Sequence, residues 1–139
     1  MKNIKITLVI AILFFLQSSF LTARSKMKPY SKKTFTTVTG KVIKSKISYN
    51  RFMKEKGLHL YLKTSKGKFI VHVCPKWYVA KKNVKYKKGK MITVSGSQFK
   101  RHGKKNIYAS SIKDGESNIL NFRNADTGKP LWRGRYRNK

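Results

Sequence analysis

Four side chains near the middle of the chain have types that could bind a metal ion: His59, Tyr61, His72 and Cys74. They fall in two stretches of alternating apolar and polar residues, which predict two strands joined by a tight turn. A turn at Lys66-Gly67 would place Tyr61 opposite His72 and His59 opposite Cys74 on one face of the hairpin. Because imidazole and thiolate bind soft metals, His59, His72 and Cys74 form a candidate metal site.

The same side chains also have a purely structural interpretation. They could cap a small β-barrel beneath a helix, with His72 hydrogen-bonded and Cys74 packed as a small apolar residue. No CxxC or CxxCH motif is present, so zinc knuckles and covalently bound haem have no support, and we predict no cofactor. A single cysteine also cannot form an internal disulfide.

The chain has no motif that is typical of an enzyme. HExxH, GxSxG and phosphate-binding glycine loops are all absent. The four acidic residues are scattered along the chain and form no evident carboxylate pair: Glu55, Asp114, Glu116 and Asp126. We therefore predict that the protein is not an enzyme and has no small-molecule substrate.

Positive charge is the strongest chemical feature of the sequence. The chain has 34 Lys and Arg residues against 4 Asp and Glu residues, which gives a formal net charge of +30 at pH 7. Such a surface attracts polyanions, namely nucleic acid, anionic lipid headgroups or acidic polysaccharide. Any single basic cluster could equally be an ordinary solvated surface.

The first 23 residues are typical of a secretion signal. Lys2 and Lys5 precede the apolar run at 6–16, which is shorter than the roughly 20 residues of a membrane-spanning helix. Cleavage near Ala23 would release an exported protein, periplasmic or secreted, while an uncleaved segment would anchor the domain outside the cytoplasm. We expect a signal-peptide helix at 1–23, a flexible basic leader at 24–33, one domain at 34–132 and a basic tail at 133–139.

The elements that position the candidate residues begin at residue 34. Alternation predicts a long first strand with a bend at Gly40, a hairpin, a short helix with Trp77, Val79 and Ala80 on its apolar side, and two further strands with a bend at Gly96. The predicted ranges are 35–49, 57–64, 68–73, 75–84 for the helix, 91–99 and 106–112. A last short hairpin is expected from 117–122 and 129–132. One face of the first hairpin is entirely apolar and should cover a core: Leu58, Leu60, Leu62, Phe69, Val71 and Val73.

This order of elements is that of an all-β, five-stranded OB-fold-like barrel with one short helix between strands 3 and 4. The run 40–132 also resembles a group of small exported (periplasmic) bacterial OB-fold proteins of uncharacterised function. The resemblance lies in Gly40-Lys41-Val42, the hairpin LHLYLKTSKGKFIVHVCPKWY, the strand ITVSGS and the closing DTGKPLW. It implies an OB-fold and export, and it implies no particular activity.

OB-folds that bind oligonucleotides use the face of strands 2 and 3, between the first hairpin loop and the loop that joins the last two strands. Cations there would neutralise phosphates, and aromatic rings could stack on bases. The candidate ligand-binding residues are Arg51, Phe52, Lys54, Tyr61, Lys100, Arg101, Lys104 and Lys105. Tyr61 could instead be part of the cover of the core.

Three functions remain open. The first is an exported, non-catalytic OB-fold binding module that attaches electrostatically to a polyanion, with single-stranded nucleic acid as the example suggested by fold analogy. The second is an envelope adaptor or structural protein that binds another protein, anionic lipid or polysaccharide. The third is a metal-binding module that uses His59, His72 and Cys74.

Overall fold

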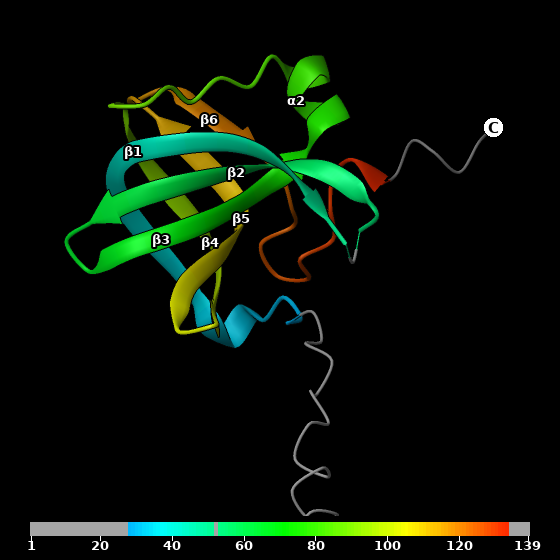
Figure 1. The fold of residues 1–139 in the computed structure, drawn as a ribbon, viewed down its shortest axis with the longest axis horizontal. Coiled ribbons are helices and arrows are strands. Elements are labelled where there is room, and N and C mark those ends of the chain that lie inside the picture. The colour runs from blue at the N-terminus through cyan, green and yellow to red at the C-terminus, as the bar shows by residue number, and fades with distance from the viewer. Residues whose placement is uncertain (1–27, 52, 134–139) are drawn as a thin grey trace, which may run out of the picture.

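A computed structural model describes residues 28–51 and 53–133. The expected signal segment, Phe52 and the tail from residue 134 onward lie outside the described residues. The chain forms mainly strands with one short helix (Figure 1). In chain order the elements are η2 (Lys32–Thr34), β1 (Phe35–Asn50), β2 (Glu55–Thr64), β3 (Gly67–Pro75), α2 (Lys76–Lys82), β4 (Met91–Arg101), β5 (Lys104–Asp114) and β6 (Asn118–Asn121).

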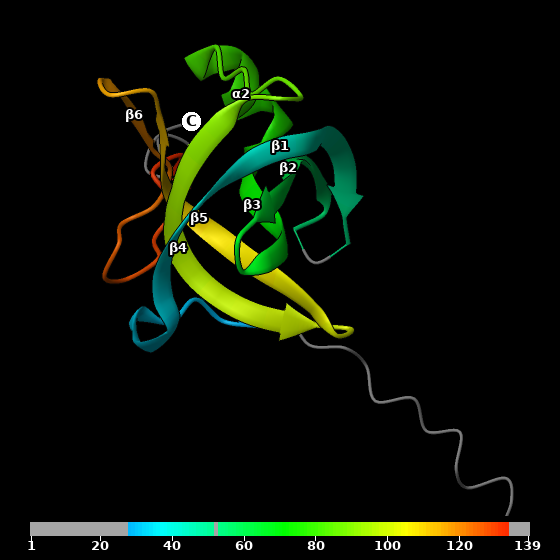
Figure 2. The same ribbon diagram turned by 90° about the vertical axis from the view of Figure 1, so that its left-hand side faces the viewer.

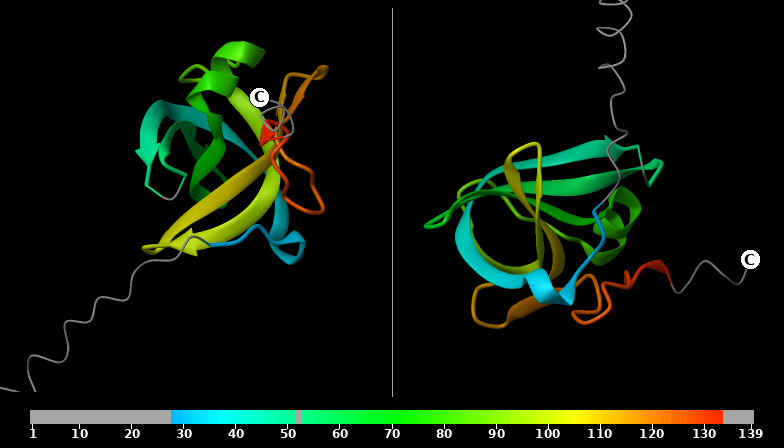
Figure 3. Two further views of the ribbon diagram at one scale, coloured as in Figure 1. Left: turned by 90° about the vertical axis from the view of Figure 1, so that its right-hand side faces the viewer. Right: turned by 90° about the horizontal axis from the view of Figure 1, so that it is seen from below.

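Five of the strands close into a barrel. The order across the sheet is β3-β2-β1-β4-β5-β6, and a parallel pairing between β3 and β5 completes the ring, which is seen from below in Figure 3, right. The strongly curved β1 pairs with β4 through its first half and with β2 through its second half (Figure 2). These observations confirm the predicted five-stranded OB-fold-like barrel with a short helix after its third strand.

Alternating burial along the strands produces the core. In β2, Leu58, Leu60 and Leu62 are buried while the residues between them are partly exposed. The apolar face predicted for the hairpin is therefore the one that points into the barrel. The largest fully buried side chains are Phe69, Phe122, Leu60, Leu62, Ile92, Ile107 and Ile112.

The register of the β2–β3 hairpin differs from the predicted one. Tyr61 lies opposite Ile70, and His59 lies opposite His72, so the predicted pairs were wrong. The turn centres on residues 65–66, because the backbone N–H of Lys66 donates to the Thr64 hydroxyl and Gly67 takes a φ of +105° that favours glycine. The partners shift by two residues, which leaves every side chain on its predicted face.

Gly40 and Gly96 lie where strands approach each other closely. A Cβ at Gly40 would stand 2.5 Å from the Lys63 carbonyl oxygen, and a Cβ at Gly96 would stand 2.0 Å from the Tyr108 carbonyl oxygen. The β1–β2 register shifts just after Gly40, between Val42 and Lys44, and the β4–β5 register shifts at Gly96. The predicted bends therefore coincide with irregularities that help to curve the sheet.

The strands β4 and β5 extend further than predicted. They run to Arg101 and from Lys104, because the connecting turn is only His102-Gly103, in which both residues have positive φ angles, 50° and 71°. Such a two-residue turn matches the twist of a hairpin.

The helix α2 and the C-terminal segment close one end of the barrel (Figures 1 and 3). Tyr78 is the buried residue of the helix, and its ring centroid lies 5.7 Å from that of Trp132. Trp77 and Val79 pack against the core as predicted, but Ala80 is exposed. A helix of only two turns buries a narrow strip of its surface against the barrel. Here this strip is centred on Tyr78, and Ala80 lies outside it.

The last predicted hairpin is largely open. Only β6 is a regular strand, and an isolated bridge joins Arg123 to Pro130 around the expected turn at 125–128. The Leu131 backbone N–H donates to the Phe122 carbonyl at 3.0 Å, which holds the returning chain against the barrel.

The described part of the leader lies against the barrel. The Tyr30 hydroxyl donates to the Ala125 carbonyl at 2.8 Å, and the Ser31 backbone N–H donates to the Ser97 hydroxyl at 2.9 Å. The polar composition of this segment did not indicate these contacts. Over the described residues, no helix has the length and apolar character needed to cross a membrane.

Candidate functional site

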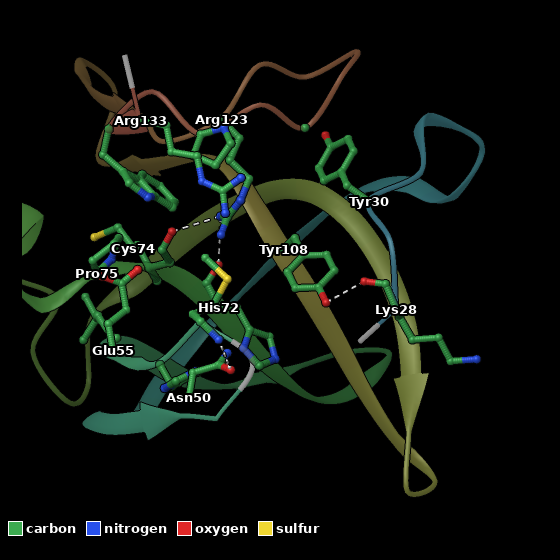
Figure 4. Close-up of a pocket in the computed structure, with 18 of the residues that line it drawn as sticks. Lys28, Tyr30, Asn50, Glu55, His72, Cys74, Pro75, Tyr108, Arg123 and Arg133 are labelled. Atoms are coloured by element: carbon green, nitrogen blue, oxygen red, sulfur yellow. Dashed lines mark hydrogen bonds between the residues drawn. The ribbon is translucent and has the colours of Figure 1, made fainter. Parts of the chain in front are cut away.

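A pocket of about 200 Å³ lies on the outer side of the barrel, next to the seam where β3 and β5 meet (Figure 4). Four parts of the chain enclose it: the leader, the β1–β2 connection, the end of β3 and the C-terminal segment. The residues that decide its chemistry are His59, His72, Cys74, Tyr108, Arg123 and Trp132.

Arg123 occupies the point where β3 and β5 separate. Its Nη1 donates to the carbonyls of Ala109 at 2.8 Å, Val73 at 3.0 Å and His72 at 3.3 Å. Parallel pairing between the two strands ends at His72 and Tyr108, so these carbonyls belong to the last paired residue of β3 and to the residues just beyond the pairing. The guanidinium thus replaces the missing strand-to-strand hydrogen bonds at the seam.

The charge of Arg123 is partly buried, and it forms no ion pair with an acidic side chain of the described residues. The ion pairs found among the described residues join Lys32 to Asp126 and Lys90 to Asp114. The Arg123 guanidinium instead lies 4.8 Å from the centre of the Trp132 ring and 5.7 Å from that of Tyr108. Burial lowers the pKa of Arg123 to about 10, so it remains a cation at neutral pH.

An aromatic cluster crosses the outer face beside the pocket. The rings of His59 and His72 meet edge to face at 4.7 Å, and those of Phe99 and Tyr108 stack at 4.4 Å. His72 links the two pairs, with centroids 5.7 Å from Phe99 and 5.6 Å from Tyr108. The Tyr108 hydroxyl donates to the Lys28 carbonyl at 2.7 Å, so the leader covers one end of the cluster (Figure 4).

Hydrogen bonds fix the protonation of His72. Its Nε2 lies 2.9 Å from Asn106 Oδ1, which can only accept, while the Asn106 amide nitrogen donates to the Lys104 carbonyl. Nε2 therefore carries the proton, and Nδ1 has the lone pair. Burial lowers the pKa of His72 to about 4, and burial also lowers the pKa of His59, so both rings are neutral at pH 7.

The structure brings all three candidate metal ligands to this pocket. However, Nδ1 of His59 is 2.8 Å from the Ser48 hydroxyl, and burial raises the pKa of the Cys74 thiol to about 12. Because the thiolate is the form that binds metals, this shift disfavours Cys74 as a ligand. Residues 28–51 and 53–133 contain no group of three His, Cys, Asp or Glu side chains that could hold a metal ion.

The candidate ligand-binding residues fall into two separate groups. Arg51 and Lys54 lie in the exposed β1–β2 connection at one end of β2, whereas Phe52 lies outside the described residues. Tyr61 lies on the outer face between the two groups, half-buried, with Lys44 Nζ 5.7 Å from its ring centroid. The other candidates surround the β4–β5 turn near the opposite end of the hairpin: Lys100, Arg101, Lys104 and Lys105.

This second group belongs to a larger surface that we call the basic end. It comprises the side chains around the β2–β3 and β4–β5 turns: Lys63, Lys66, Lys68, Lys100, Arg101, Lys104 and Lys105. Three cross-strand pairs in it have like charges: Lys63 with Lys68, Lys100 with Lys105, and Arg101 with Lys104. The Lys105 ammonium joins the two turns, because it donates to the Lys66 carbonyl. Glu55 and Asp114 lie at the other ends of their strands.

Sequence reasoning missed Phe99, Tyr108 and Arg123. Alternation in β5 could have identified Tyr108, since it shares the outward face that lies opposite Ile107 and Ala109. Arg123 follows β6 in a segment without regular strand pairing, and no local pattern distinguishes it from the many other basic residues.

Comparison with known proteins relates the barrel to one family. A comparison with curated protein sequences found no match. The model of the MamS/MamX magnetosome protein family, in contrast, matches residues 34–119 of the 139 residues, which covers β1 through the start of β6. Since this match covers more than half of the sequence and contains the complete barrel, the chain belongs to the MamS/MamX magnetosome protein family.

Proposed function

We propose that this chain is an exported, non-catalytic binding module that attaches electrostatically to a polyanion through its basic end. The observation that carries the proposal is two like-charged cross-strand pairs, Lys63 with Lys68 and Lys100 with Lys105. Directly opposed like charges destabilise a sheet when no counter-charge is present. An anionic partner would attract the lysines and would also relieve the repulsion between them. Both the attraction and the relief of repulsion favour binding at the basic end.

A membrane is the polyanion that we favour. The matching family is described as a magnetosome family, which favours association with the magnetosome membrane. The predicted signal at 1–23 would deliver the domain to the outer side of the cytoplasmic membrane. Each Lys or Arg near an anionic membrane contributes roughly 1 kcal/mol, so the seven cations of the basic end supply on the order of 7 kcal/mol at most.

Nucleic acid has less support from the outer face. The rings of His72, Phe99 and Tyr108 are stacked on one another, and the leader contacts Tyr108. Bases would have to displace these contacts before they could stack there. Single-stranded nucleic acid therefore becomes an alternative outcome of the same experiment.

The proposal that the module is non-catalytic rests on the state of its reactive groups. The raised pKa of Cys74 keeps the thiol protonated, and a protonated thiol is a poor nucleophile. The lowered pKa values of His59 and His72 make both residues weak general bases near neutral pH.

The test measures binding to lipid vesicles and oligonucleotides. All strands of the described residues lie within 35–121, so the chain from Arg24 onward contains the whole barrel without the predicted signal. We expect this protein to bind phosphatidylglycerol vesicles, to release them as salt rises, and to ignore phosphatidylcholine vesicles. A single-stranded oligonucleotide and a matched duplex are titrated under the same conditions.

Charge-reversal variants locate the surface. Lys63→Glu with Lys104→Glu would create opposite-charge pairs with Lys68 and Arg101, so the fold should tolerate it. The matched control, Lys87→Glu with Lys88→Glu, makes the same change in net charge on an exposed connection. We expect the first variant to lose at least about ten-fold more vesicle affinity than the control.

One result would contradict the basic end as the binding surface, and another would contradict a membrane as the polyanion. Equal losses in both double variants would mean that total charge, and not the basic end, drives the attraction. Tighter binding of the single strand than of vesicles, kept near physiological salt, would instead support a nucleic-acid module.

A further inference from the structure

The pocket beside the β3–β5 seam is separate from the basic end. Its lining includes Glu55 and Gly57 at the start of β2, whereas the basic end surrounds the turn at the other end of that strand. The attachment proposed above does not use the pocket. Its chemistry can therefore be considered independently.

The pocket contains donors that a bound anion could use. All hydrogen bonds found for Arg123 use Nη1, although a guanidinium has five N–H donors. Among the described residues, the Tyr86 hydroxyl is the only fully buried side-chain polar atom without a partner. The Nε and Nη2 groups of Arg123 are therefore not sealed inside the protein, and Arg123 is one of the residues that line the pocket.

The charges around the pocket favour a single negative charge. Arg123 is a partly buried cation without an ion pair among the described residues, and a charge in this environment is stabilised by an opposite charge. Lys28 and Arg133 also line the pocket. The acid Glu55 lines it as well, but no ion pair joins Glu55 to Arg123.

The remaining walls suit an apolar body. Pro29, Met53 and Pro130 add apolar residues to the lining, and the rings of Tyr108 and Trp132 flank the guanidinium. The imidazoles of His59 and His72 are neutral, so they add no charge. A cavity of about 200 Å³ has room for a molecule of a few carbon atoms or one small ring.

We propose that this pocket binds a small organic carboxylate, whose charged group pairs with Arg123 and whose apolar body lies against Tyr108 and Trp132. The planar fork of arginine matches the two oxygens of a carboxylate. A phosphate dianion would bring a second negative charge for which the pocket has no equally buried cation. The bound molecule is a ligand of the pocket, and no reaction is assigned to it.

The experiment titrates benzoate into the protein from Arg24 onward and follows it by NMR. Benzamide is the control, because it has the same ring and shape without the charge. We expect saturable shifts at Gly57, His72 and the Trp132 indole with benzoate, and none with benzamide. Acetate, which lacks the ring, should bind at least about ten-fold more weakly than benzoate.

Variants test the two halves of the site. Arg123→Lys keeps the charge and removes the fork, and we expect at least about ten-fold weaker benzoate binding. Because Arg123 also supports the seam, a second variant leaves it intact: Gly57→Leu. A Cβ at Gly57 has its nearest neighbour, the Cys74 carbonyl oxygen, at 3.4 Å, so a β-carbon fits there, and we expect the rest of the leucine side chain to fill the pocket. Gly57→Leu should abolish benzoate binding without unfolding the protein.

The basic-end variant Lys63→Glu with Lys104→Glu provides the last control. It should retain benzoate affinity, since neither residue lines the pocket. Equal binding of benzoate and benzamide would overturn the proposal, because the pocket would then recognise only the ring. It would also be overturned if Gly57→Leu left the benzoate shifts unchanged, or if the shifts followed the lysines of the basic end. Vesicle binding could fail without affecting any of these results.

Discussion

Gly96 lies under the backbone of a neighbouring strand, and this position decides which residue can occupy it. A Cβ there would stand 2.0 Å from the Tyr108 carbonyl oxygen, which belongs to rigid backbone. We expect Gly96→Ala to lower the free energy of unfolding by more than about 2 kcal/mol, because the strands must separate to relieve the clash. Urea denaturation measures this change.

Gly57→Ala is the matched control. Its new Cβ would have only ordinary contacts, at 3.4 Å and beyond, and Gly57 has no positive φ. Its stability should stay within about 1 kcal/mol of the wild type. Equal destabilisation by the two substitutions would show that lost glycine flexibility, and not the close approach at Gly96, is the cause.

His72 makes the stability of the domain depend on pH. Its pKa is about 4 in the folded protein and ordinarily about 6.5, so the unfolded chain binds the proton first as pH falls. The stability contributed by neutral His72 is complete above pH 6.5 and is lost between about pH 6.5 and 4. The difference between the two pKa values corresponds to a loss of about 3 kcal/mol in the free energy of unfolding.

Denaturation between pH 7 and pH 4 measures this loss. His72→Gln, which can still reach Asn106, should have a flatter pH dependence than the wild type. An unaltered slope in His72→Gln would assign the pH dependence to other groups.

At the scale of elements, the seam between β3 and β5 is where the barrel depends on one side chain. Arg123 bridges both strands through three carbonyls, and Trp132 covers its guanidinium. We expect Arg123→Met to cost about 3 kcal/mol or more, because the carbonyls lose a charged donor. Faster amide exchange should be concentrated in β3, β5 and the segment after β6.

The control for the seam is Arg133→Met, which changes an exposed arginine near the same pocket. Its exchange rates should match those of the wild type. Uniformly faster exchange across all strands of Arg123→Met would mean that the residue supports global stability, without a specific role at the seam.

At the scale of the whole molecule, charge opposes folding. A formal net charge of +30 on 139 residues repels itself, and among the described residues only two ion pairs offset it. We expect the midpoint of thermal unfolding to rise by several degrees as potassium chloride increases from low to physiological concentration, because salt screens this repulsion.

The double variant Lys63→Glu with Lys104→Glu should begin at a higher midpoint and gain less from salt. The variant Lys87→Glu with Lys88→Glu separates local from total charge, since it changes the net charge equally without creating cross-strand pairs. If salt raised the midpoint of all three proteins by the same amount, nonspecific salt effects would explain the stabilisation in place of charge repulsion.

Alternation along the sequence predicted the strands, and their order together with the resemblance to small exported OB-fold proteins predicted the barrel. The period-two pattern predicted that Leu58, Leu60 and Leu62 lie inside the barrel, as they do. Gly40 and Gly96 interrupt predicted strands, and this indicated the two places where strands approach closely. Alternation determines which face of the sheet a side chain lies on. It does not determine the residue opposite it on the neighbouring strand, because a register shift of two residues leaves the face unchanged. For this reason the face of His59 was predicted correctly and its partner, His72, was not.

The pocket was decided by tertiary structure alone. Its walls come from four parts of the chain that are distant in sequence, and its central cation, Arg123, is one of 34 basic residues without a local pattern around it. Its role depends on where β3 and β5 separate, which follows from the closure of the barrel. The sequence by itself determined the fold class, the inward faces and the charge; the closed barrel decided which charge became buried and which rings came together.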